Sequence, residues 1–127
     1  MTKNFNHRTT EADVLRACLD YLALDPNRIG YVFWRQNTAP TYEPTRQQYR
    51  AMPKYARKGV PDIIVLLPPH GRFLGIEVKG PQGRQSPEQK GFQFDIERAG
   101  GLYWIVRSVD DLELLMPDEP YRPKKGV

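Results

Sequence analysis

The chain has 127 residues, of which 39% are hydrophobic and 11% aromatic, and it carries a formal net charge of +4. This composition suits one globular domain with its own core and argues against a disordered chain. The longest unbroken apolar run, residues 63–67, is far shorter than the about 20 residues of a membrane helix, and residues 1–10 lack the apolar part of a secretion signal. Cys18 is the single cysteine, and the sequence has two histidines, His7 and His70. Neither an internal disulfide nor a tetrahedral zinc site is therefore expected.

A helix and a strand are predicted in the first part of the chain. Thr10 is a candidate N-cap, with Asp13 three residues further on. The apolar residues that follow have helical spacing: Val14, Leu15, Cys18, Leu19 and Leu22. The pattern predicts a helix from residue 10 to the break at 25–27, with Cys18 in the core and not a papain-like nucleophile. Residues 31–34 are β-branched and aromatic, which predicts a strand.

The whole charge excess lies in residues 35–60, which also contain Tyr42, Tyr49 and Tyr55. Against the single acid Glu43 stand six cations: Arg35, Arg46, Arg50, Lys54, Arg57 and Lys58. Three prolines and the absence of a regular spacing of apolar residues predict a loop over 37–59, with one short helix at most. Cations interleaved with aromatic side chains suit a polyanion, because they neutralise phosphates and release counterions. A solvated loop on an ordinary basic protein is the alternative.

Strands and helices alternate in the rest of the chain. The apolar strands 62–67 and 73–79 are joined by a short turn, which predicts a hairpin. Ser86 as N-cap and Pro87 at the first helical position begin a helix that ends at Gly100. A strand at 102–107, a short helix at 109–116 and a frayed tail at 117–127 follow. The order α-β-β-β-α-β predicts an α/β domain over residues 1–116, in which helices flank a mixed sheet.

Polar residues occur where the strand pattern favours apolar ones. Glu77 and Lys79 share one face of the strand 73–79, and Gly75 is expected to leave open space beside them. A surface ion pair is the alternative. Asp62 begins the most apolar strand, so in a hairpin it lies beside residues 77–79. Two carboxylates brought together repel each other, and a divalent cation such as Mg²⁺ commonly binds between them. The alternative is that Asp62 only forms a turn after Pro61.

Each of two helices adds one polar residue. Glu11 precedes the apolar positions of the first helix at helical spacing, so it is expected on the buried face, although the helix dipole alone also favours an acid there. Gln89 is in line with Phe92 and Ile96 and is expected to face the sheet. There it could hold a water or a phosphate, or cap the end of a strand.

Taken in order, the segments Gly59–Asp62, Ile76–Lys79 and Ser86–Gln89 resemble the motifs of the PD-(D/E)XK nuclease superfamily. The closest resemblance is to its VRR-NUC family, the virus-type replication-repair nucleases. The helix with Glu11 and the segment Arg35–Thr38 also fit, so the resemblance covers roughly residues 10–107. It implies a restriction-endonuclease-like core with the element order given above.

The resemblance also implies the chemistry. The implied ligands of Mg²⁺ or Mn²⁺ are Asp62, Glu77, the Val78 carbonyl and, through water or a second ion, Glu11. Such a metal lowers the pKa of bound water and stabilises charge on the phosphate. Lys79 would orient or deprotonate the water or neutralise the transition state, and Gln89 would support the site.

Stand-alone VRR-NUC domains are similar to Holliday-junction resolvases, which implies branched DNA as substrate, a homodimer, a role in DNA repair and a cytoplasmic location in a bacterial or phage-infected cell. A flap, nicking or restriction-like nuclease, and a non-catalytic nucleic-acid-binding module, are the alternatives. The residues expected to contact nucleic acid are Arg35, Asn37, Arg46, Arg50, Lys54, Arg57, Lys58 and Arg84.

Overall fold

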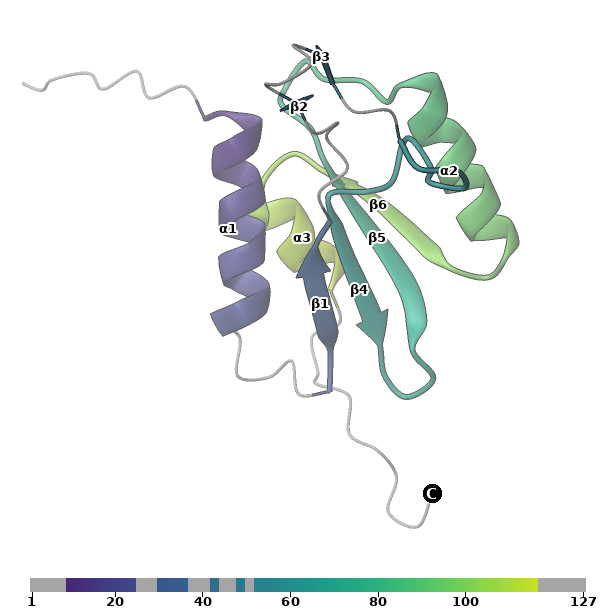
Figure 1. Cartoon of the computed structure of the whole chain (residues 1–127). Coiled ribbons are helices and arrows are strands. Elements are labelled where there is room, and N and C mark those ends of the chain that lie inside the picture. The colour runs from purple at the N-terminus through teal and green to yellow at the C-terminus, as the bar shows by residue number, and fades with distance from the viewer. Residues whose placement is uncertain (1–8, 25–29, 37–41, 44–47, 50–51, 117–127) are drawn as a thin grey trace, which may run out of the picture.

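The computed structural model describes residues 9–24, 30–36, 42–43, 48–49 and 52–116 (Figure 1). The elements are α1 (Glu11–Leu24), β1 (Val32–Arg35), β2 (Tyr42–Glu43), β3 (Gln48–Tyr49), β4 (Ile63–Leu67), β5 (Arg72–Val78), α2 (Pro87–Arg98), β6 (Leu102–Val106) and α3 (Val109–Leu115). The predicted order is confirmed. The short antiparallel pair β2–β3 was not predicted, and in the described part of residues 37–59 there is no helix. The predicted tail at 117–127 lies outside the described residues.

The four main strands form one mixed sheet in the order β1-β4-β5-β6. The pairs β1–β4 and β4–β5 are antiparallel, and β5–β6 is parallel because α2 makes the crossover between them. In the β4–β5 hairpin Ile63 lies opposite Ile76. Continuing this register by one residue places Asp62 opposite Glu77 on the same face of the sheet.

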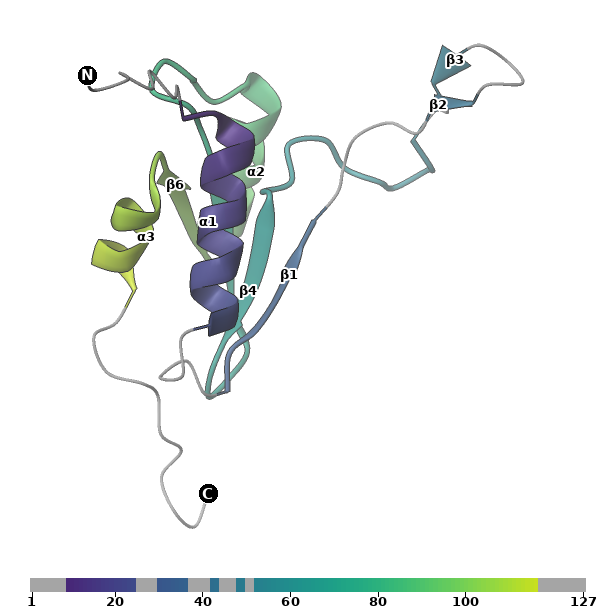
Figure 2. The ribbon, with the colours of Figure 1, turned by 90° about the vertical axis from the view of Figure 1, so that its left-hand side faces the viewer.

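The helices cover opposite faces of this sheet. In Figure 2, α1 lies in front of the sheet and α2 behind it, with α3 next to α1. The core lies on the α1 and α3 face and consists of Val14, Cys18, Leu22, Ile63, Val65, Leu74, Ile76, Val78, Val106, Leu112 and Met116. Cys18 is completely buried there, as its spacing predicted. The opposite face carries Glu77, which therefore points away from the main core and towards α2.

Local hydrogen bonds explain where the helices begin. The Thr10 N–H donates to the Asp13 carboxylate and the Asp13 N–H donates to the Thr10 hydroxyl, which is the predicted capping pair of α1. Ser86 caps α2 in a full capping box with Gln89. The chain leaves α2 at Gly100, whose positive φ of 95° suits glycine. None of the helices in the described ranges is long and apolar enough to cross a membrane.

Candidate active site

Two carboxylates meet where β4 begins and β5 ends. Glu77 is only 3% exposed and is the one charged side chain that is buried among the described residues. The half-buried Asp62 lies opposite it, and its Oδ2 accepts a hydrogen bond of 2.8 Å from the Val78 N–H. The Asp62 carbonyl accepts a second bond of 2.8 Å from the Gln36 N–H. Both neighbouring strands therefore hold Asp62 beside Glu77.

The surroundings of Glu77 disfavour its charged form. Burial, the negative charge of Asp62 and a hydrogen bond to Asp62, in this order of size, raise the pKa of Glu77 to about 8. The positive charge of Lys79 and the Tyr103 hydroxyl act in the opposite direction. Without a bound cation, Glu77 is therefore mostly protonated at neutral pH.

The N-terminal cap of α2 directs Gln89 towards this pair. The Gln89 side-chain oxygen accepts a hydrogen bond of 2.8 Å from the Ser86 N–H, and the Ser86 hydroxyl accepts one of 3.1 Å from the Gln89 N–H. Because its oxygen is engaged in the cap, the Gln89 amide presents Nε2 to Glu77 and donates to Oε1 over 2.9 Å. The prediction that Gln89 faces the sheet is confirmed, and its contact is with the buried carboxylate.

Tyr103 is a site residue that the sequence analysis missed. Its hydroxyl lies 3.5 Å from Glu77 Oε2, and burial, followed by the charge of Glu77, raises the pKa of Tyr103 to about 12. Gln85 forms a hydrogen bond with the same hydroxyl and donates to Gln93 over 2.8 Å. Tyr103 reaches Glu77 because the parallel register pairs Gly75 with Tyr103. The sequence carries no signal for this parallel register.

Glu11 and Lys79 lie beside the turn that follows β5. Glu11 is exposed, which corrects the prediction of a buried position, but its Oε1 accepts a hydrogen bond of 3.0 Å from the Gly80 N–H. A Cβ placed on Gly83 would lie 3.2 Å from Glu11 Oε1 and 3.3 Å from Lys79 Cδ. Glu11 and Lys79 therefore flank the same small residue. No group of three or more His, Cys, Asp and Glu side chains suited to a metal ion occurs within the described part of the chain.

The space expected beside Gly75 is filled. A Cβ on Gly75 would lie 2.5 Å from Pro61 Cγ, far inside van der Waals contact. Pro61 is fully buried and packs over the glycine from the residue directly before Asp62. Gly75 is thus needed for the close approach of the β4 entry to β5, and the prediction of an open space was wrong.

The predicted nucleic-acid contacts have different surroundings. Arg35, Lys58 and Arg84 are exposed, and the Lys54 ammonium lies 5.1 Å from the Tyr55 ring centroid. Arg57 is bound within the protein, because its guanidinium forms a salt bridge with Asp95 and lies 5.0 Å from the Phe92 ring centroid. The remaining predicted contacts, Asn37, Arg46 and Arg50, lie outside the described residues.

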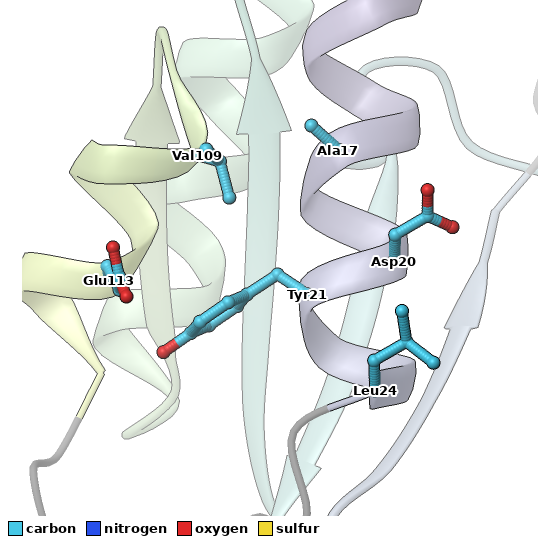
Figure 3. Close-up of a pocket in the computed structure, with 6 residues that line it drawn as sticks. All are labelled: Ala17, Asp20, Tyr21, Leu24, Val109 and Glu113. Atoms are coloured by element: carbon cyan, nitrogen blue, oxygen red, sulfur yellow. The ribbon is translucent and has the colours of Figure 1, made fainter.

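A groove of about 590 Å³ lies between α1 and α3 (Figure 3). Its mostly apolar lining includes Tyr21 and Leu24, with Asp20 and Glu113 as the charged side chains. This groove is on the core side of the sheet, whereas Glu77 faces α2. It contains none of the predicted site residues, so the acid pair and the groove are separate features.

The acid pair fits a divalent cation by the chemistry of its donors. Two carboxylates are hard oxygen ligands, and Mg²⁺ commonly uses one or two of them together with water and phosphate oxygens. The negative charge of Asp62 contributes to the raised pKa of Glu77, and a cation between the two carboxylates would offset this repulsion. Asp62 and Glu77 are the residues that would hold the ion.

The fold and the acid pair define a class of protein. A four-stranded mixed sheet flanked by helices, with an Asp and a Glu-x-Lys on adjacent strands, is a PD-(D/E)XK-like nuclease core. The family model of the VRR-NUC domain matches residues 10–110, and the chain belongs to this family. No curated protein and no solved structure matches the chain significantly. The protein therefore carries a nuclease domain, which implies hydrolase activity on DNA.

Proposed function

We propose that the protein is a Mg²⁺- or Mn²⁺-dependent endonuclease that hydrolyses phosphodiester bonds in branched DNA, with the four-way junction as its preferred substrate. The observation that carries this proposal is the pairing of Asp62 with the buried Glu77, whose pKa is raised to about 8. Lys79 follows on the same strand, and exposed basic residues lie on the segment that leads into Asp62. A DNA strand that contacts this segment is close to the acid pair.

In this proposal Asp62, Glu77 and the Val78 carbonyl hold the cation, and Glu11 binds it through water or holds a second ion. When bound there, the ion would supply an activated water and stabilise charge on the phosphate. Glu77 would hold such a cation in its charged form, because a positive charge would offset the repulsion from Asp62. Gln89 and Tyr103 then hold the two oxygens of the charged Glu77.

Lys79 is assigned the catalytic role that needs a positive charge close to the metal ligands. It shares a strand face with Glu77, and its charge already stabilises the ionised carboxylate. In the proposed reaction it orients or deprotonates the attacking water, or neutralises the charge that develops on the phosphate. Its position beside Gly83 and Glu11 places it at the exposed edge of the site.

The proposed substrate follows from the kind of contacts available. Lys and Arg contacts to phosphate position DNA without reading its sequence, so selectivity for a branched structure is expected from the basic segment. A homodimer would present two such sites to the two strands of a symmetric junction. Cleavage of that junction places the protein in DNA repair.

The test is a cleavage panel of four-way junction, flap, nicked and linear duplex DNA with Mg²⁺, with Mn²⁺ and with EDTA. Paired nicks in the junction are expected, with a loss of at least about 10²-fold in Asp62→Ala and Lys79→Ala. Glu113→Ala, an exposed acid on α3, serves as the control that keeps activity. Preferential cleavage of the flap or linear duplex would replace the junction by one of those substrates. Intact binding without any cleavage would instead indicate a non-catalytic module.

A further inference from the structure

Arg57 is exposed like the cations near it, with 47% of its side chain accessible, but it differs from them because α2 holds its guanidinium. Asp95 forms the salt bridge, and the Phe92 ring centroid lies 5.0 Å from the guanidinium carbon. An arginine that stacks on an aromatic ring and pairs with a carboxylate has part of its charge and hydrogen-bonding requirement met within the protein. The Asp95 carboxylate and the Phe92 ring therefore compete with a phosphate for the Arg57 guanidinium.

The chain near Arg57 is attached to α2 and β5 at two further points. Gly59 has a φ of +81°, and a Cβ there would lie 2.4 Å from the Glu88 carbonyl oxygen, so the backbone rests directly on the first turn of α2. Pro61 then packs on Gly75 of β5. Residues 57–61 are thus attached at three successive points before the chain reaches Asp62.

These attachments are connected to the acid pair through Phe92. The Phe92 ring lies under Arg57 and packs against Tyr103, with 6.5 Å between the ring centroids. Tyr103 in turn reaches Glu77 with its hydroxyl. The contact that holds the basic segment and the contact that holds Glu77 therefore share one buried aromatic cluster.

We propose that Arg57 is a positioning residue that anchors the basic segment 52–60 on α2 through Asp95 and Phe92, and that it does not itself contact phosphate. The anchor sets the place of the exposed Lys58 relative to Asp62 and so determines where a bound phosphate lies. This inference rests on the proposed function of the segment in DNA binding. It replaces the expectation that Arg57 is a direct nucleic-acid contact.

Substitution of Asp95 distinguishes a phosphate-contacting Arg57 from an anchoring Arg57, because the two roles predict opposite changes in DNA affinity. If Arg57 contacts phosphate, Asp95→Asn releases it and removes a negative charge near the DNA, so binding tightens. If Arg57 is an anchor, the same substitution loosens the segment and binding weakens. Arg57→Ala weakens binding in both cases, so it does not discriminate between the roles by itself.

The experiment measures junction affinity by fluorescence anisotropy at several salt concentrations for Asp95→Asn, Arg57→Ala and the double variant. Hydrogen exchange of residues 52–60 is measured on the free proteins. We expect Asp95→Asn to weaken binding about five- to tenfold, with faster exchange and a double variant no weaker than Arg57→Ala alone. Asp20→Asn, an exposed position on α1, is the matched control and should leave both readouts unchanged. Lys58→Ala should lower the salt slope by about 1 without changing exchange.

Equal or tighter binding by Asp95→Asn, or unchanged exchange in it, would overturn the anchor and leave the proposed function intact. A wild-type protein that binds no junction, flap or duplex would overturn the proposed function, and with it the DNA-positioning role. Exchange data on the free protein would then still report whether Asp95 holds the segment. The two failures are therefore distinguishable.

Discussion

The substitution Glu77→Gln tests the central electrostatic feature of the site. The introduced side chain keeps the shape of Glu77 and can accept from Gln89 through its oxygen, as Glu77 does now. Its NH₂ group can donate to Asp62, which is the role of the proton on the carboxyl of Glu77. The variant therefore resembles protonated Glu77 at every pH, and it never carries the unfavourable charge.

The effect on stability follows from linkage. Glu77 has an ordinary pKa of 4.5 when the chain is unfolded and a pKa of about 8 in the folded protein. Between these values the folded state binds more protons, so the free energy of unfolding decreases by about 1.4 kcal/mol for each pH unit. The loss begins near pH 4.5 and is complete above pH 8. For a rigid site without a cation it amounts to about 5 kcal/mol.

Urea denaturation of wild-type protein and Glu77→Gln in EDTA, from pH 5 to pH 8.5, measures this effect. The variant should be nearly as stable as wild type at pH 5 and more stable by several kcal/mol at pH 8. Glu113→Gln corrects for the loss of one exposed carboxylate. Mg²⁺ added at pH 8 should stabilise wild type and reduce the difference, because it binds the folded state with Glu77 ionised. A stability difference that is constant with pH would refute the raised pKa.

Three further predictions concern neighbouring residues. Gly75→Ala should destabilise the protein by about 1–3 kcal/mol in urea denaturation, because its Cβ meets Pro61; an unchanged midpoint would contradict this packing. Tyr103→Phe removes a hydroxyl near Glu77 and should weaken Mg²⁺ binding about fivefold in a thermal-shift titration, whereas equal binding would show that the hydroxyl is not involved. Cys18 is completely buried, and burial raises its pKa to about 11. Its thiol should therefore react with Ellman's reagent at pH 8 only after unfolding, so rapid reaction of the folded protein would argue against the core position.

Local patterns were sufficient to predict most of the fold. The period of the first helix placed Val14, Cys18 and Leu22 in the core, and all three are buried. Ser86 and Pro87 located the start of α2, because capping depends on residues close in sequence. The apolar run at 63–67 and the short turn after it predicted the hairpin with β5. In each of these cases neighbouring residues determine the structure.

Only the part of the site that the β4–β5 hairpin forms could be predicted from the sequence. Asp62 and Glu77 were expected together because an antiparallel register follows from a short turn. Tyr103 was missed, since its approach to Glu77 depends on a parallel pairing made through α2. Gly75 was misinterpreted because the residue that covers it, Pro61, is 14 positions away. The salt bridge of Arg57 with Asp95 spans 38 positions, and composition alone gave Arg57 the same role as the other cations of the segment.

The backbone keeps Asp62 and Glu77 side by side, although two charged carboxylates there would repel each other. Asp62 is held from both sides, by the Gln36 N–H on its carbonyl and the Val78 N–H on its carboxylate. Glu77 is held by Gln89, whose own orientation is determined by the cap of α2. Neither carboxylate can turn away without the loss of a part-buried hydrogen bond, which typically contributes about 0.5–1.5 kcal/mol. Without a cation the site avoids this repulsion by keeping Glu77 protonated at neutral pH, and a cation between the two oxygen donors would stabilise the charged pair instead.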